Sequence, residues 1–136
     1  MTRSIASLFA TTATIGMMGS AFGAAMTDAE IKTFLSGMTA YLETTAASTS
    51  GKAGQAVIYF AEDGKALYKT PSGDVWHGTW TTKNDQLCAD WKEKPNNACL
   101  KYDKEGDLIT VHDANSGELR ATVVETAHGN AENIAP

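Results

Sequence analysis

A regular alternation of short apolar segments with turn-forming residues constrains the fold of this chain more than any other feature. Between residues 55 and 125, segments of about six residues with strand character end at turn sequences such as Asp63-Gly64, Pro71-Ser72-Gly73 and Asn115-Ser116-Gly117. With a weaker segment over residues 38–45, seven or eight strands are expected. Short connections at this spacing predict a mainly β fold, an antiparallel meander that forms either a small lipocalin-like barrel or a sandwich.

One short helix is predicted ahead of the strands. Thr27 and Glu30 have the spacing of a capping box, in which each side chain accepts from the backbone N–H of the other residue. The apolar residues that follow share one stripe at helical spacing: Ile31, Phe34, Leu35 and Met38. Gly37 is placed to end the helix. Later in the chain, a polar loop is expected over residues 92–97, between strands over 86–91 and 98–103, and a polar surface tail after Thr126.

The first 25 residues have the pattern of a secretory signal peptide. Arg3 carries their only charge, an apolar stretch follows, and small residues surround Gly23. Cleavage is expected after Gly23 or after Ala25, which leaves a single β-rich domain over residues 26–136. An uncleaved anchor is the alternative, but threonines, serines and glycines make the stretch weakly hydrophobic for a membrane span. We therefore expect a periplasmic or secreted protein without a stable membrane anchor.

The charge of the chain limits its partners. The formal net charge is −5, and loss of residues 1–25 removes only Arg3, so the mature charge is −6. A modestly acidic domain repels phosphate backbones, so nucleic acid is not an expected partner.

Both cysteines, Cys88 and Cys99, lie in the expected mature domain. An even cysteine count in a small exported protein predicts one structural disulfide, and the C-x-x-C spacing of a redox site is absent. If the two bridge a hairpin, both point to one side of the sheet. Strand alternation then gathers the following apolar residues on the other side: Leu87, Trp91, Leu100 and Tyr102.

Aromatic residues are the candidates for a binding site. The predicted ligand-binding residues are all aromatic and lie on strands: Trp76, Trp80, Trp91, Tyr59 and Tyr102. Gly78 separates two indoles of one face, and a glycine there leaves a notch. We expect at least one of these indoles to line a cavity or groove open to solvent. The alternative is core packing, with a neighbouring ring or the helix filling the notch.

No catalytic residue, metal ligand or cofactor is predicted. The three histidines, His77, His112 and His128, lack the spacing of a metal site. No nucleophile motif is present. A cluster of acids among Asp85, Asp90, Glu93 and Asp103 would be needed for hydrolysis of sugars, and solvated acids near turns are the commoner explanation.

Several of these residues resemble the pattern of a family of small exported proteobacterial proteins, domain of unknown function 995. The matching residues span the mature chain: Met26 to Ile31, Asp63-Gly64, Gly78-Thr79-Trp80, Leu87-Cys88, Trp91, Cys99, Tyr102, Gly106-Asp107 and Gly129 to Glu132. Ala131 stands where that family often has proline, and residues 46–54 form a longer loop. The resemblance implies a barrel-like domain after a leading helix and implies no activity. The general build is also similar to periplasmic lysozyme inhibitors, whose signature residues do not occur here.

Together these patterns predict a periplasmic, non-enzymatic binding or accessory protein. Its partner would be a small apolar ligand or another protein of the cell envelope. The alternative is a cell-envelope hydrolase, or an inhibitor of one.

Overall fold

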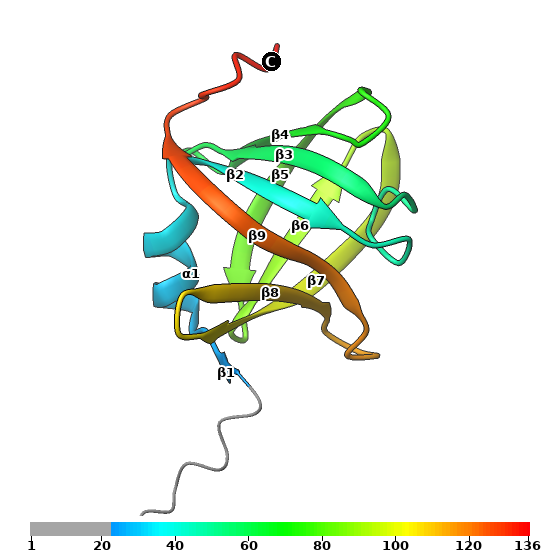
Figure 1. Cartoon of the computed structure of the whole chain (residues 1–136). Helices are drawn as coiled ribbons and strands as arrows, with labels where there is room; N and C mark the ends of the chain where they lie inside the picture. Colours follow the sequence, from blue (N-terminus) through cyan, green and yellow to red (C-terminus); the bar gives the residue numbers. More distant parts are fainter. Residues whose placement is uncertain (1–22) are drawn as a thin grey trace, which may run out of the picture.

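Eight antiparallel strands close into an up-and-down barrel in the computed structural model, which describes residues 23–136 apart from the side chains of residues 95–98 (Figure 1). The strands follow one another around the barrel in chain order: β2 (Met38–Thr44), β3 (Gly54–Phe60), β4 (Lys65–Lys69), β5 (Val75–Lys83), β6 (Gln86–Trp91), β7 (Lys94–Glu105), β8 (Leu108–Asp113) and β9 (Leu119–His128). A further strand of two residues, β1 (Ala24–Ala25), pairs with β7.

Pairing of the last strand with the first decides between a barrel and a sandwich. Met38 at the start of β2 is opposite His128 at the end of β9, and the pairing continues to Thr44 opposite Ala121. Since β7 also pairs with β8, every strand from β2 to β9 has two neighbours. The fold is therefore a closed barrel, and the sandwich alternative is wrong.

Most strand boundaries agree with the sequence prediction to within one or two residues, but β7 and β9 do not. β7 begins at Lys94, inside the segment predicted as a polar loop, and a two-residue turn joins it to β6. Proline and asparagine are poor strand formers, yet pairing with a neighbour overrides local propensity in a sheet. β9 continues to His128, two residues into the predicted tail.

The predicted helix is confirmed as α1 (Asp28–Leu35), but Met38, which the prediction includes in its apolar stripe, is the first residue of β2. Thr27 Oγ1 accepts from the Glu30 N–H at 3.2 Å, and Glu30 Oε1 accepts from the Thr27 N–H at 2.9 Å, so the capping box forms. Gly37 adopts a φ of 75° just beyond the helix, a conformation that favours glycine, and leads directly into β2.

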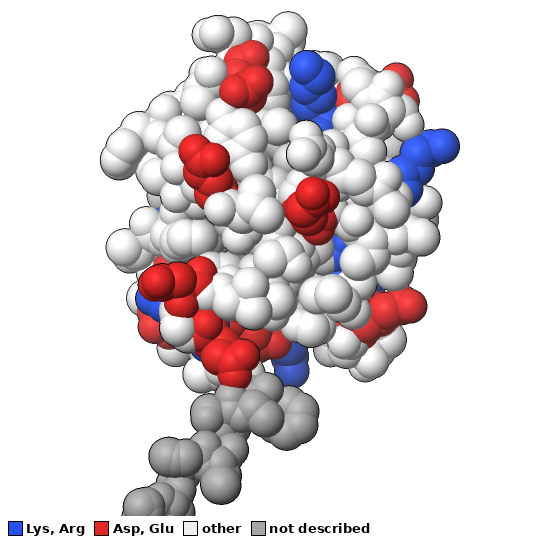
Figure 2. Space-filling view, in the orientation of Figure 1, with Lys and Arg blue, Asp and Glu red and all other residues white. Residues whose placement is uncertain are grey.

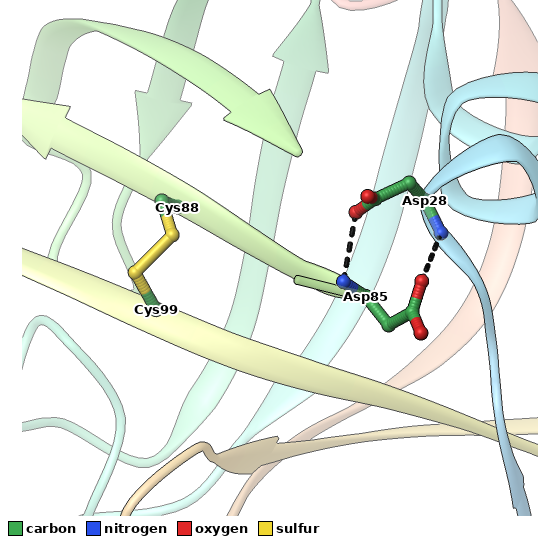
Figure 3. The surroundings of a disulfide bond; sticks show 4 residues. All are labelled: Asp28, Asp85, Cys88 and Cys99. Carbon is green, nitrogen blue, oxygen red and sulfur yellow. Dashed lines mark hydrogen bonds between the residues drawn. A yellow bond between two sulfur atoms is a disulfide. The ribbon is translucent and has the colours of Figure 1, made fainter. Parts of the chain in front are cut away.

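Two aspartates fasten α1 to one end of the barrel (Figure 3). The backbone N–H of Asp28 donates to Asp85 Oδ1 and the N–H of Asp85 donates to Asp28 Oδ1, both at 2.9 Å. Asp85 lies in the turn between β5 and β6. The reciprocal pair gives a partner to one of the free N–H groups at the helix start and joins it to the hairpin. Ile31 and Leu35 of α1 are fully buried in the core, so the helix closes this end of the barrel.

The C-terminal segment crosses the outside of the barrel. Thr39 Oγ1 donates to the Gly129 carbonyl at 2.6 Å and accepts from the Ala131 N–H at 3.0 Å, while Tyr41 Oη donates to Glu132 at 2.7 Å. Ile134 is buried although it lies outside the main core. The expected surface tail is thus a strap held against β2.

The predicted signal peptide lies almost entirely outside the described residues. Within residues 23–136, no helix combines the length and hydropathy needed to cross a bilayer.

Acidic side chains are more numerous than basic ones on the face that β8 and β9 present in Figure 2.

Candidate functional site

The interior of the barrel contains a cavity of about 40 Å³. Its walls are mostly apolar and come from β2, β3, β4, β6, β7, β8 and β9: Leu42, Ile58, Phe60, Tyr68, Leu87, Ala89, Trp91, Leu100, Tyr102, Val111 and Ala121. Thr44, Ser48, Thr49 and Arg120 complete the lining with polar groups.

Strand alternation explains why these side chains meet. Leu87, Ala89 and Trp91 point inward from β6, and Leu100 and Tyr102 point inward from β7. This is the grouping that the cysteine argument predicts from the sequence. Cys88 and Cys99 lie directly opposite each other on the other face of the same strands, with their Cα atoms 4.1 Å apart, and the predicted disulfide is confirmed (Figure 3).

A loop of small polar residues, 45–53, covers the end of the cavity opposite to α1. Ser48 is its only buried residue, and Ser48 and Thr49 reach the cavity lining. Hydrogen bonds hold the loop: Lys94 Nζ donates to the Thr49 carbonyl at 2.6 Å, and Ser48 Oγ donates to the Lys52 carbonyl at 3.0 Å. We call this loop the mouth loop. Its one buried residue is polar and no large apolar side chain belongs to it, so we expect it to be the part of the cavity wall that opens at least cost.

Arg120 is the only cation in the described lining of the cavity. A β-bulge places it there: Val111 is opposite Ala121 and His112 is opposite Leu119, so Arg120 is the extra residue of β9. Bulges commonly redirect a side chain in this way. The guanidinium Nη2 donates to Asp113 Oδ2, whereas its Nε is buried and has no acceptor among the described protein groups.

Asp113 is held as a carboxylate at the same end of the barrel. It accepts from the backbone N–H groups of Asn115 and Ser116, each at 2.8 Å, and from Arg120. The backbone donors of Ser116 and Asn115, followed by the Arg120 guanidinium, lower the pKa of Asp113 from 3.8 to about 2.

Two of the five predicted ligand-binding aromatics line the cavity, Trp91 and Tyr102. The Tyr102 side chain is fully buried, and burial raises the pKa of its phenol. The Trp91 ring packs against Tyr68, with ring centroids 5.3 Å apart. Tyr68 is a cavity residue that the sequence prediction omitted, and burial raises its pKa as well.

The other three predicted aromatics lie elsewhere. Trp80 is a core residue, 8% exposed, that packs edge-on against Phe60 and donates its indole N–H to the Ala61 carbonyl. Trp76 is half-buried and packs edge-on against Tyr68 from outside the cavity lining. Tyr59 lies between Ile58 and Phe60 on β3, two cavity residues, and does not itself reach the cavity.

The notch expected at Gly78 is filled, so that expectation is wrong. A Cβ placed on Gly78 would lie 2.1 Å from the Asp90 carbonyl oxygen and 2.8 Å from the Trp91 ring. Glycine is needed there because β6 approaches too closely for any side chain. The alternative, that a neighbouring ring fills the space beside Gly78, is confirmed, and this ring is Trp91.

The acids considered for hydrolysis do not assemble. Asp85 is engaged with Asp28, Glu93 with the Nδ1 of His77 at 2.8 Å, and Asp103 with the Nε2 of His112 at 3.5 Å. The hydrogen bond from His77 lowers the pKa of Glu93. Among the described residues, no group of three or more His, Cys, Asp or Glu side chains is arranged to hold a metal ion.

Sequence reasoning missed the polar end of the cavity. Arg120 reaches the interior through a bulge, which breaks the alternation by which strand faces are assigned. The sequence predicts a loop over residues 46–54, but nothing in its composition indicates that this loop covers a cavity.

The protein is thus an eight-stranded antiparallel β-barrel with a small interior cavity, whose walls are mostly apolar and which has polar groups at one end. Comparison with protein-family models, with curated proteins and with solved structures gives no match. The resemblance noted from the sequence therefore stays a prediction.

Proposed function

We propose that this protein is a non-enzymatic binding protein of the cell envelope that holds a small apolar ligand inside its barrel. The observation that carries the proposal is the cavity itself, which is walled by aliphatic and aromatic side chains and bears a few polar groups at one end only. Binding sites for small molecules have this composition, and barrel interiors are among the places where they occur.

The size of the cavity restricts the ligand. Its volume is about 40 Å³, whereas an engineered apolar cavity of about 150 Å³ binds benzene. A ligand larger than a few heavy atoms therefore requires the mouth loop to move outward. The hydrogen bonds that Lys94 and Thr44 of the barrel donate to the loop carbonyls of Thr49 and Lys52 are the contacts that such a movement would break.

A location outside the cytoplasm is part of the proposal. A disulfide between two strands suits an oxidising compartment, and the pattern of residues 1–25 suits export. Cleavage after Gly23 would retain Ala24–Ala25 and its pairing with β7, whereas cleavage after Ala25 would remove this strand. Mass spectrometry of the exported protein should find Ala24 as the first residue; an intact Met1 in the membrane fraction would contradict the proposal.

A cavity-filling variant tests the binding site. We expect hexan-1-ol to shift the NMR signals of the Trp91 indole and of the Tyr102 amide in the wild-type protein. Ala89→Leu places extra carbon atoms in the cavity wall and should abolish these shifts. Thr79→Leu, an exposed position on the neighbouring strand, is the matched control and should bind normally. Absence of any shift in the folded wild-type protein would refute the proposal.

No observation on the described residues favours the alternative, a hydrolase or an inhibitor of one. Three of the four acids considered for hydrolysis, Asp85, Glu93 and Asp103, are each engaged with a different partner.

A further inference from the structure

We infer that the ligand is a small acidic amphiphile, whose apolar part occupies the barrel and whose anionic head group binds Arg120. This inference rests on the proposed function and adds the chemical class of the ligand. A neutral apolar molecule would use the same walls but would leave the guanidinium unused.

The first support is the buried Nε–H of Arg120. A guanidinium has five N–H donors, and the described protein groups supply an acceptor only for its Nη2, from Asp113. A buried donor without a partner is unfavourable. An oxygen of a bound head group would satisfy it once the mouth loop moves and uncovers the Nε, which is fully buried in the closed barrel.

The second support is the bulge that brings Arg120 to the cavity. A regular β9 would alternate without an extra residue, and its inward positions here are otherwise the apolar Ala121 and Val123. The extra residue thus adds one charge to an apolar wall. Asp113 keeps this guanidinium oriented, since its own carboxylate is held by two backbone N–H groups.

The third support is the polar surroundings of Arg120. Thr44, Ser48 and Thr49 reach the same end of the cavity, and Lys94 holds the mouth loop above it through the Thr49 carbonyl. A guanidinium in polar surroundings suits a carboxylate or a comparable anion. In the closed barrel the hydroxyls of Thr44 and Ser48 donate to loop carbonyls, so they become donors to a head group only when the mouth loop moves. The alkyl or aryl part of the ligand would point from there toward Trp91 and Tyr102.

Two probes of equal chain length separate this inference from the proposed function. Hexanoate and hexan-1-ol have the same number of carbon atoms, and at pH 7 only hexanoate is charged. Isothermal titration of the full mature protein should show hexanoate binding about 10- to 100-fold more tightly, as expected for a charged hydrogen bond. Equal affinities would overturn the inference but would still support the proposed function, binding of an apolar ligand in the barrel. Binding of neither probe would overturn both.

Substitutions at the mouth test the role of Arg120 directly. Arg120→Gln should abolish the preference for the anion, so that the ratio of the hexanoate affinity to the hexan-1-ol affinity falls to about 1. Asp113→Asn should increase the affinity for hexanoate, because it removes the competing negative charge while the asparagine oxygen still accepts from the guanidinium and keeps it oriented. Lys65 is an exposed cation at the end of the barrel that α1 closes. Lys65→Gln therefore controls for the change in net charge and should change neither affinity. If Arg120→Gln does not fold, the Asp113→Asn variant provides the test. An unchanged affinity for hexanoate, or an equal increase in affinity for hexanoate and hexan-1-ol, would contradict the inference.

Discussion

Gly78 shows how closely a single position can be constrained by the strand beside it. The carbonyl oxygen of Asp90 and the Trp91 ring occupy the space of a Cβ atom. We predict that Gly78→Ala lowers the free energy of unfolding by about 3 kcal/mol, because β5 and β6 must separate to admit one methyl group. Urea unfolding measures the loss. Thr79→Ala, at the adjacent exposed position, should cost far less, and equal losses would contradict the explanation.

Asp113 makes a pH-dependent contribution to stability. Its folded pKa of about 2 lies below the ordinary value of 3.8, so folding favours the carboxylate. The contribution is complete above pH 3.8 and is lost as the pH falls through 2. Asp113→Asn should therefore destabilise the protein at neutral pH and show a smaller further loss on acidification to about pH 2 than the wild type.

The control for this pH dependence is a carboxylate at the other end of the barrel. Asp107 is exposed and is the last residue of the turn that joins β7 to β8. Asp107→Asn removes one negative charge without touching Arg120, and so measures what the change in net charge alone does to the stability profile. An acid limb that is the same in the Asp113 variant and the wild type would contradict the role assigned to Asp113.

At the scale of elements, the junction of α1 with the β5–β6 turn depends on the Asp28–Asp85 pair. Asp85 has a φ of 59°, so glycine at this position removes the carboxylate without backbone strain. We expect Asp85→Gly to cost about 1 kcal/mol, the usual value of a helix-capping acceptor, and to speed hydrogen exchange of the α1 amides. Asp85→Asn retains an oxygen acceptor and should behave nearly as the wild type. Unchanged exchange in Asp85→Gly would show that burial of Ile31 and Leu35 alone holds the helix.

At the scale of the whole molecule, the disulfide links two strands of a barrel that is already closed by pairing. Cys88 and Cys99 are 11 residues apart in the chain. In the chain-entropy model, removing such a link should lower the free energy of unfolding by about 2–4 kcal/mol. The double substitution of Cys88 and Cys99 by serine tests this in urea, with an alanine pair as the control for polarity. Wild-type stability in both double variants would contradict the prediction.

Much of this architecture could be predicted from local signals. The capping box at Thr27 and Glu30, the turn glycines and the alternation of Leu87, Ala89 and Trp91 each depend on a few neighbouring residues. Local signals failed where pairing extends a strand, as at Lys94, or where a bulge changes its face, as at Arg120. Both depend on the neighbouring strand, which local sequence does not specify.

One helix, a meander of strands and a disulfide follow from the amino-acid sequence alone, because propensity, turn chemistry and cysteine parity act over short distances. Three outcomes follow only from the folded barrel: β9 closes on β2, Trp91 and Tyr102 face a cavity while Trp80 belongs to the core, and Arg120 lies at the mouth. These outcomes depend on contacts between residues far apart in the chain, such as Met38 with His128. Their energies arise from burial and register in the closed barrel.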